Sequence, residues 1–572
     1  MKKSYLIFLI VIVIIAGAWL SIRFLFLKTK DVKPDNSKAA SVLDLRPAII
    51  AKLQQLVKDG SGGLYHLSIE QVEPDISSLG LDIMNGALIP DTAVLKNLDS
   101  AHKLPDDIFK LSFSTLHISG VGIDDLLSKD HLSLRQISIA SPVIEVWHKK
   151  RRYNKGSKND SATLYQRLFK SMKSIVVDEV AVSNAGFILH DFSKNQTNRF
   201  NNVSLSMRDV LIDSSTQADK KRYLFAKHAD LTVKNFSAYS ADSLYSFKCS
   251  SIHISPTEDR LTALNIEMHP DKQQFKRRFS ERKERYELVV PKLRLSGIGW
   301  WELINERTLI AKEAVMEKGR CHVFIDRSLP FRKVRPDNFP HQQLMRLPVS
   351  FFISRLHMRN SNLTYSEYNP GMDKTGAIYV SNVSGELMNA TNIPARIKLR
   401  KMMSIRSSGL FMHKVPMTMS FQFDLSKYKT GDFRVDLIIG KMDSSVLNPM
   451  AVPMGEFMIK EGQIQQGIAH VSGNNFKTHG QGKLLYSGLY LVALKKDEDK
   501  EGGTKKKKLL SRLANVILIK NENPSNDEPV REVDFYFDRE AKLTFFSFIW
   551  KTIYIGILKL IGLPQSFADK SY

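Results

Sequence analysis

The sequence predicts a mainly β protein, built as an elongated array of repeated antiparallel strands. From about residue 65 to residue 490, apolar and polar residues alternate with the period of two that is typical of strands with one buried face. Few segments in this range have the length and periodicity of a helix. The chain also contains an internal duplication, and repetition on this scale favours an array over a single globular domain.

Composition and charge narrow the class of protein further. The chain has 572 residues, of which 43% are hydrophobic and 25% charged, so it has the composition of a folded protein. Two cysteines, Cys249 and Cys321, are too few for a disulfide framework, and we expect free thiols. The formal net charge is +24. In a chain with a membrane anchor and a β-rich body, this charge favours anionic lipid head groups over nucleic acid as the partner.

Residues 1–27 are expected to form a transmembrane anchor. Lys2 and Lys3 precede an apolar run from Tyr5 to Ile22, and a bilayer-spanning helix needs about 20 such residues. Residues 16–18 (Ala-Gly-Ala) resemble a signal-peptidase site, so cleavage is the alternative. Residues 28–63 are expected to be a linker followed by a short helix that stops at a glycine-rich segment.

The clearest alternation predicts a hairpin in the C-terminal part of the body. Two alternating runs, 417–425 and 433–437, flank a turn at Thr430-Gly431-Asp432, and their apolar residues would share one face of the sheet. The candidates for an apolar groove are Met417, Met419, Phe421, Phe423, Leu425, Phe433, Val435 and Leu437.

The duplication divides the body into two β-rich modules, 64–290 and 291–493. Residues 116–126 align without gaps on residues 293–303, and the register continues to Val146 and Val323. Both copies contain Ser-Gly-x-Gly. No strand, loop and long helix with a basic partner accompany this motif, so we interpret it as a turn and not as a phosphate-binding loop.

Recognisable catalytic chemistry is missing from the sequence. It contains no His-Glu-x-x-His, Cys-x-x-Cys, Gly-x-Ser-x-Gly or Gly-x-x-x-x-Gly-Lys-[Ser/Thr] motif. We therefore expect no catalytic residues, no metal site and no cofactor, and interpret the chain as a protein that is not an enzyme.

The C-terminal residues predict contact with a membrane. A charged loop at 494–510 precedes a segment, 511–572, that we expect to contain strands and an amphipathic helix lying in the membrane interface. A second spanning helix and an internal core helix are the alternatives. The candidate membrane-contact residues are Phe545, Phe546, Phe548, Trp550, Lys551 and Lys559.

Short motifs near both ends of the body resemble those of the AsmA-like family. They include Leu447-Asn448-Pro449, Gly480-Gln481-Gly482 and Tyr486-Ser487-Gly488-Leu489, together with the N-terminal order of anchor, short helix and glycine-rich stop. Residues 1–150 and 410–565 carry most of the resemblance. It implies a protein of the Gram-negative envelope, anchored in the inner membrane by a single pass with its body in the periplasm. It also implies a bridge-like lipid transfer protein whose sheet forms a taco-like or half-pipe groove with an apolar interior.

Two functions remain open at this stage. A sheet with one apolar face must cover it with helices, a second sheet or a ligand. Lipid in the groove would indicate phospholipid transport to the outer membrane, or homeostasis of that membrane, with membrane lipids of both membranes as partners. A face-to-face β-sandwich array would cover the same face without lipid. That alternative favours an envelope scaffold or outer-membrane protein assembly factor with protein partners.

Overall fold

The computed structural model describes residues 46–563, except 76, 78, 121–130, 155–173, 193–195, 214, 217–218, 220, 224, 241, 279, 307, 331–336, 348, 456, 496–511, 517–518, 526–527 and 541–542. The expected anchor (1–27) and most of the expected charged loop (494–510) lie outside these residues. Within the described part of the chain, no helix has both the length and the apolar composition to cross a membrane.

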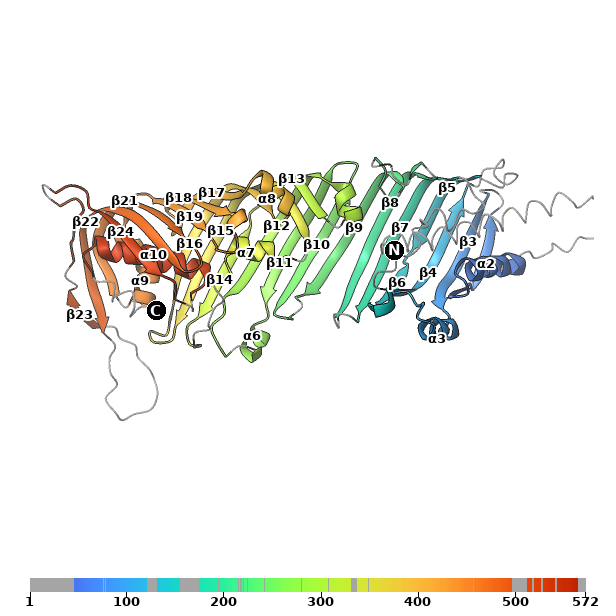
Figure 1. The fold of residues 1–572 in the computed structure, drawn as a ribbon, viewed down its shortest axis with the longest axis horizontal. Coiled ribbons are helices and arrows are strands. Elements are labelled where there is room, and N and C mark those ends of the chain that lie inside the picture. The colour runs from blue at the N-terminus through green and yellow to red at the C-terminus, as the bar shows by residue number, and fades with distance from the viewer. Residues whose placement is uncertain are drawn as a thin grey trace, which may run out of the picture. The chain divides into compact units, whose positions relative to one another are not determined.

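The protein is mainly β, as the alternation predicted. The described residues form 24 strands of mixed β-sheet, joined by short helices and turns (Figure 1). The chain divides into two compact units, which are described separately. Unit 1 comprises residues 1–241 and 248–263, and unit 2 comprises residues 242–247 and 264–572.

The described part of unit 1 starts with a helix and consists mostly of strands. Its elements are α2 (Arg46–Gly60), β1 (Tyr65–Ser68), β2 (Gln71–Asp75), β3 (Gly80–Pro90), α3 (Thr92–Ser100), β4 (Asp107–Ser119), β5 (His131–Ala140), β6 (Val143–His148), η1 (Arg152–Asn154), β7 (Ser174–Asp191), β8 (Gln196–Ile212) and β9 (Ala226–Tyr239). The unit boundary falls within β10 (Tyr245–Ser255) and β11 (Arg260–Pro270).

Unit 2 contains the remaining strands and most of the helices. Its elements are α6 (Lys272–Arg278), β12 (Arg285–Ile298), η3 (Glu302–Glu306), β13 (Thr308–Glu317), β14 (Arg320–Asp326), α7 (Pro340–Met345), β15 (Ser350–Asn369), β16 (Lys374–Thr391), α8 (Pro394–Leu399), β17 (Met402–Phe411), β18 (Val415–Asp424), η4 (Leu425–Lys427), β19 (Phe433–Ile439), β20 (Met442–Asp443), η5 (Ser444–Leu447), α9 (Asn448–Gly455), β21 (Phe457–Gly473), β22 (Lys477–Lys495), β23 (Arg512–Val516), β24 (Glu532–Asp538) and α10 (Phe545–Leu560).

The internal duplication is confirmed as a repeated arrangement of five strands. In unit 1, β4 pairs with β5 and then with β6, both of these pair with β7, and β7 pairs with β8. In unit 2, strands β12–β16 repeat the same pairings in the same order. The two copies of the sequence therefore encode the same strand topology.

The expectation of a purely antiparallel sheet was wrong in both copies. Strands β5 and β6 run parallel to β7, and β13 and β14 run parallel to β15. The reason is that each long strand, β7 or β15, pairs with two shorter strands in succession, and the chain must cross over to reach it. Alternation alone does not fix strand direction, because side chains alternate in parallel and antiparallel strands alike.

Corresponding backbone positions also repeat between the copies. Asn184 in β7 and Asn360 in β15 have φ values of 53° and 49°, and each lies at a register shift with the following strand. Gly120 and Gly297, from the two Ser-Gly-x-Gly motifs, have φ values of 69° and 63°. A Cβ on either glycine would lie within 2.5 Å of a side chain on the neighbouring strand. The motif therefore places glycine where the backbone needs a left-handed conformation and close approach.

Each unit has its own cluster of buried apolar residues. In unit 1, Leu53 and Val57 of α2 join a core of strand residues that includes Leu81, Ile83 and Leu116. In unit 2, α9 and α10 pack on one face of the strands. Figure 1 shows α10 lying along strands β21, β22 and β24.

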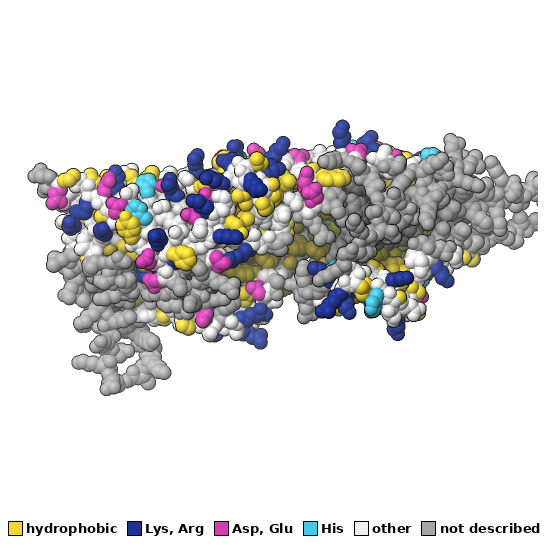
Figure 2. All heavy atoms as spheres, in the orientation of Figure 1, with side chains coloured by type: hydrophobic (Ala, Val, Ile, Leu, Met, Phe, Trp, Pro, Cys, Tyr) yellow, Lys and Arg dark blue, Asp and Glu magenta, His cyan; other side chains and the backbone are white. Residues whose placement is uncertain are grey.

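Strands β12–β14 of unit 2 belong to neither buried cluster. Their apolar side chains are largely half-buried, as in Leu288 and Leu293. Figure 2 shows hydrophobic side chains set back in a hollow in the region of β12. Part of the apolar face of unit 2 therefore lacks a packed cover among the described residues.

Candidate functional site

The predicted hairpin is confirmed, and its apolar residues share one face of the sheet. Strands β18 and β19 are antiparallel, and the cross-strand pairs are Met419 with Leu437, Phe421 with Val435, and Phe423 with Phe433. Met417 lies on the same face of β18 because it is two residues from Met419. Leu425 follows in η4 and is fully buried. We call this side of the unit 2 sheet the interior face.

The opposite face of the same strands is polar. Ser420 donates a hydrogen bond to Asp436, with 2.9 Å between Oγ and Oδ2, and the imidazole of His470 lies 2.7 Å from the same carboxylate. Gln481 and Asp534 continue this polar row on β22 and β24, joined by a hydrogen bond of 2.9 Å. The alternation in the sequence therefore separates the apolar interior face from a polar face that carries Ser420, Asp436, Gln481 and Asp534. We call the polar side the wet face.

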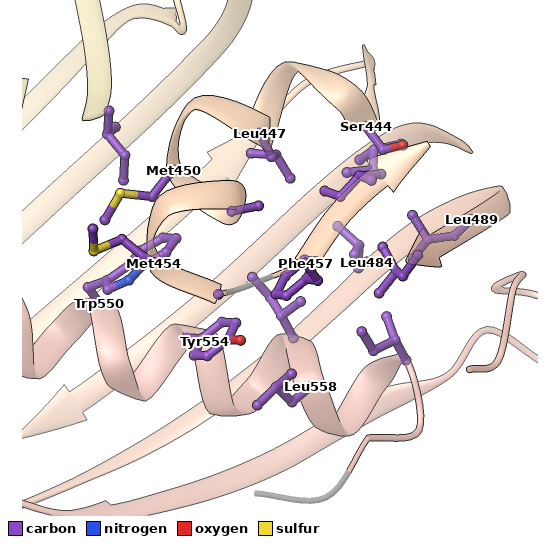
Figure 3. Close-up of a pocket in the computed structure, with 18 of the residues that line it drawn as sticks. Ser444, Leu447, Met450, Met454, Phe457, Leu484, Leu489, Trp550, Tyr554 and Leu558 are labelled. Atoms are coloured by element: carbon purple, nitrogen blue, oxygen red, sulfur yellow. The ribbon is translucent and has the colours of Figure 1, made fainter. Parts of the chain in front are cut away.

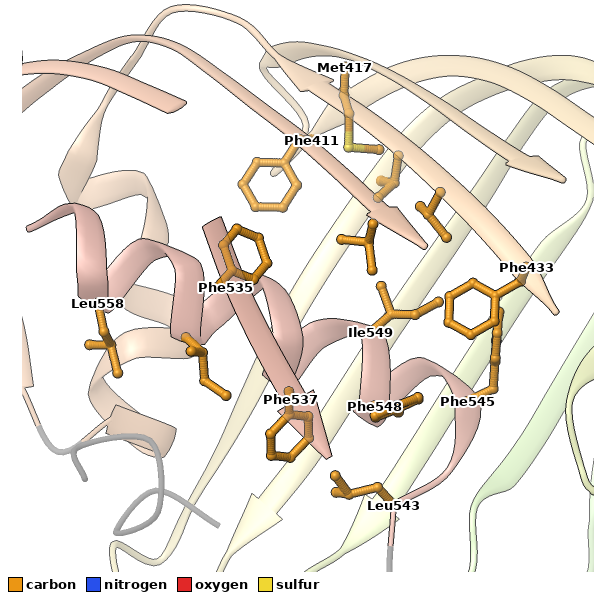
Figure 4. Close-up of a cluster of buried hydrophobic side chains, with 14 of the residues drawn as sticks. Phe411, Met417, Phe433, Phe535, Phe537, Leu543, Phe545, Phe548, Ile549 and Leu558 are labelled. Atoms are coloured by element: carbon orange, nitrogen blue, oxygen red, sulfur yellow. The ribbon is translucent and has the colours of Figure 1, made fainter. Parts of the chain in front are cut away.

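Part of the interior face is a dry core packed beneath α7 and α10. The rings of Phe423 and Phe433 lie 5.8 and 5.2 Å from that of Phe545 on α10. Phe433 also packs on Phe339, with ring centroids 5.5 Å apart. Figure 4 shows residues of α10 and the strands gathered in this cluster. The groove candidates at this end therefore contact the protein's own aromatic residues, while Met419, Phe421 and Leu437 are half-buried.

An unusual histidine lies in this core. His341 of α7 is fully buried, its ring centroid is 4.8 Å from that of Phe423, and neither ring nitrogen has a hydrogen-bond partner. Burial lowers the pKa of His341 to about 4, and the carboxylates of Asp432 and Asp424 oppose this effect only in part.

The six candidate membrane-contact residues lie on different sides of α10. Phe545, Phe548 and Lys551 are buried against the sheet, whereas Phe546 and Lys559 are exposed and Trp550 is half-buried. Lys551, one of the candidate membrane-contact residues, is buried within the unit. Its ammonium group pairs with Glu540 and lies 5.2 Å from the centre of the Phe537 ring, so the charge is satisfied inside the unit.

Helix α10 approaches β24 closely through a glycine. The ring of Phe535 lies against Gly480 of β22 and Gly556 of α10. A Cβ on Gly480 would fall 2.0 Å from this ring, and one on Gly556 would fall 2.5 Å from it. The two glycines therefore provide the space in which an aromatic side chain joins helix to sheet.

A cavity of about 120 Å³ lies between α10, α9 and the strands. Figure 3 shows Met454 of α9 beside Trp550 of α10, with Tyr554 further along α10 and Phe457 and Leu484 on the strands. The ends of Met450 and Met454 lie close to Gly376 of β16. The lining is almost wholly apolar: Ile378, Phe411, Met412, Leu447, Met450, Ala451, Met454, Phe457, Ile459, Ile464, Leu484, Leu489, Leu491, Trp550, Tyr554, Ile557, Leu558, Ile561 and Leu563, with Gly455 and Ser444.

Two charged residues, Arg327 and Glu367, complete the cavity wall. Their nearest side-chain nitrogen and oxygen are 3.7 Å apart, and both side chains are largely buried. Burial raises the pKa of Glu367, although a hydrogen bond from Tyr365 and the charge of Arg327 act against this. The hydroxyl of Tyr365 also lies 3.4 Å from that of Ser547, which connects this polar group to the first turn of α10.

A second carboxyl group lies at the start of α10. Thr544, the N-cap residue, donates a hydrogen bond of 2.5 Å to Glu284, and Tyr286 donates another to the same carboxyl group. Burial raises the pKa of Glu284, and the charge of Glu367 adds to this. Polar groups therefore cluster at this end of the helix, and apolar ones line the cavity further along it.

Most of the residues in the cavity wall were not among the candidates from the sequence. The Leu-Asn-Pro motif, however, lies directly before two of them, Met450 and Met454. Asn448 of the Leu-Asn-Pro motif accepts a hydrogen bond from Ile459 N and donates one to Ile459 O, each 2.9 Å long. These bonds fix the start of α9 beside β21. Met450 and Met454 follow at a spacing of four, which places both on one side of the helix. Arg327 and Glu367 had no local sequence signal.

The described residues contain no group of three or more His, Cys, Asp or Glu side chains suited to holding a metal ion. No protein-family model matches the chain, and a search of curated proteins gives no significant match. The functional assignment therefore depends on the geometry described above and on the sequence resemblance.

Proposed function

We propose that this protein is an AsmA-like lipid-binding protein that holds acyl chains against the interior face of unit 2. The observation that carries the proposal is the apolar cavity beneath α9 and α10. A cavity with this lining excludes polar ligands and favours a flexible hydrocarbon, because burying each methylene contributes about 0.8 kcal/mol.

The size of the cavity limits what it can enclose. An apolar cavity of about 150 Å³ in another protein accepts a benzene ring, so about 120 Å³ accommodates a short part of an acyl chain. The rest of the chain would lie along the half-buried apolar residues of the same face. Methionines suit such a wall, because their side chains are flexible and adapt to ligands of different shape.

Under this proposal the protein is anchored in the inner membrane, its body lies in the periplasm, and it supports phospholipid transport to the outer membrane or homeostasis of that membrane. The net charge of +24 supports a partner with anionic head groups. The resemblance of the terminal motifs to AsmA-like proteins supports the location.

Site-specific photocrosslinking tests lipid binding. The crosslinker p-benzoylphenylalanine would replace Phe457 in the cavity wall or, as a matched control, Tyr536 on the wet face of β24, which is 67% exposed. After irradiation in cells, the full chain would be purified and its tryptic peptides analysed by mass spectrometry. We expect a lipid adduct at position 457 only. Equal adducts at both positions, or none at 457, would refute the proposal.

A scaffold or assembly factor is the alternative function, and the dry core beneath α10 favours it. There the protein covers its own apolar face with the aromatic residues of α10. If the whole interior face is closed in this way, irradiation at position 457 would yield crosslinks within the chain and no lipid.

A further inference from the structure

Five loops of unit 2 meet at one edge of the sheet and are joined by hydrogen bonds. Gln342 donates to the carbonyl of Tyr428 over 2.7 Å and to the side chain of Asn475 over 3.0 Å. Asn475 in turn donates to the carbonyl of Lys429, and Arg539 donates to the carbonyl of Asn475.

The loop between β16 and β17 belongs to the same edge. Asn392 donates to the carbonyl of Val349 over 2.9 Å, Arg396 of α8 lies over the ring of Phe352, and α8 contacts η4. The edge is therefore a connected surface and not a set of independent loops.

Four large apolar side chains protrude from this edge into solvent. Leu399, at the end of α8, is 83% exposed, and Phe476, between β21 and β22, is 66% exposed. Leu347 and Val349, before β15, are about half exposed. Exposed apolar residues gathered on one surface mark sites of interaction with a protein or a membrane.

Exposed cations surround these apolar residues. They are Arg346, Lys398, Arg400, Lys401, Lys427, Lys429 and Lys477. We call these seven residues, with Leu347, Val349, Leu399 and Phe476, the basic edge. Figure 2 shows Lys and Arg side chains interspersed with hydrophobic ones along the border of unit 2 where α8 lies.

Among the described residues, the cations of the basic edge outnumber the carboxylates near them. Asp337 pairs with Arg346, Asp538 lies opposite Lys477 in the β22–β24 pair, and Asp424 interacts electrostatically with Lys401. Asp432 is half-buried and accepts a hydrogen bond from Thr430. No ion pair with a described residue involves Lys398, Arg400, Lys427, Lys429 or Lys477. The basic edge therefore keeps an excess of positive charge that an anionic partner can neutralise.

We propose that the basic edge docks on the surface of an anionic lipid membrane, with Leu399 entering the head-group layer. The charge pattern favours a membrane over an acidic protein. The cations come from four separate loops and protrude around apolar tips. Basic residues attract anionic leaflets without fixed geometry, and exposed apolar side chains partition into the interface. Leu399 is flanked by Lys398, Arg400 and Lys401, which combines both contributions on one short helix.

The proposal goes beyond lipid binding in the cavity, and the two can fail separately. Full-length protein held in nanodiscs of neutral phosphatidylcholine would be mixed with vesicles containing 30% phosphatidylglycerol or with pure phosphatidylcholine vesicles, and binding would be measured by flotation. We expect flotation with the anionic vesicles only.

The triple variant Lys398→Gln/Arg400→Gln/Lys401→Gln tests the location. Each basic residue near an anionic surface contributes about fivefold to binding, so the three changes should weaken it about a hundredfold. The matched control Lys272→Gln/Lys276→Gln/Arg277→Gln removes three exposed charges from α6, also in unit 2, and should retain most of the binding. Equal losses in the two variants would show that overall charge, and not the basic edge, attracts the vesicle. Unchanged binding in the first variant would also overturn the proposal.

A second measurement reports contact directly. An environment-sensitive fluorophore on Leu399→Cys should shift to the blue with anionic vesicles, and one on Tyr536→Cys, on the wet face, should not. Cys249 is buried and burial raises the pKa of Cys321, so the added cysteine should react first. No shift at position 399 while the vesicles still bind would assign docking to another surface.

Discussion

Replacing His341 by phenylalanine should remove an acid sensitivity that is built into the core of unit 2. The imidazole is fully buried, both ring nitrogens lack hydrogen-bond partners, and the Phe423 ring lies 4.8 Å away. Phenylalanine has a similar shape, carries no polar atoms and could keep the packing on Phe423.

The size of the effect follows from the pKa of His341, which burial lowers from 6.5 to about 4. Between these two values the unfolded chain binds a proton that the folded protein does not, so the native state loses stability as the pH falls through this window. A difference of about 2.5 pH units corresponds to at most about 3.4 kcal/mol. At neutral pH the variant should gain about 1 kcal/mol, because two buried nitrogens no longer go without partners.

Hydrogen–deuterium exchange on the full chain can measure the local stability around His341, in peptides covering residues 339–346 and 417–425. Comparing protein and variant at the same pH, 7.5 and then 4.5, removes the pH dependence of chemical exchange. Protection should be similar or slightly higher in His341→Phe at pH 7.5 and clearly higher at pH 4.5. His66→Phe, at an exposed position of β1 in unit 1, is the control and should change neither value. The same difference between protein and variant at both pH values would refute the reasoning.

Three further predictions test other features. Gly556→Leu should displace α10, because even a Cβ would lie 2.5 Å from the Phe535 ring. Urea unfolding of unit 2 should then show that the free energy of unfolding falls by about 1–3 kcal/mol. Unchanged stability would mean that the helix is loosely packed. Asn360→Val should lower the unfolding temperature by placing a β-branched residue at φ 49°, at a cost of about 1–2 kcal/mol, whereas Asn360→Gly should be tolerated. Glu284→Gln should stabilise the protein at pH 8 and progressively less towards pH 4.5, because burial raises the carboxyl pKa and its ionisation above that pH destabilises the fold. If the stability gained by Glu284→Gln increased as the pH fell, the raised pKa of Glu284 would be contradicted.

The strand content, the duplication and the hairpin could be predicted because each has a local or self-similar pattern. Met419, Phe421 and Phe423 alternate with polar residues, and this spacing alone places them on one face. The correspondence between residues 116 and 293 likewise anticipated that β4 and β12 play the same part in the topology.

Strand direction and the polar wall of the cavity could not be predicted in this way. Arg327 directly follows β14 and Glu367 lies on β15, with α7 between them in the sequence, and only the parallel pairing of β14 with β15 brings them together. The burial of Lys551 could not be predicted for a related reason. Its carboxylate partner, Glu540, lies eleven residues earlier and outside helix α10, so no local pattern on the helix indicates the pair.

The strand pairings also bear on how this chain reaches its native state. Each described pairing joins strands that are adjacent or next but one along the chain, including the β5–β7 and β13–β15 crossovers. Contacts between near neighbours in sequence carry a small loop-closure cost, so folding can start in either five-strand copy and spread from it. A chain of this kind can add strands in the order in which they are synthesised, without waiting for its C-terminus.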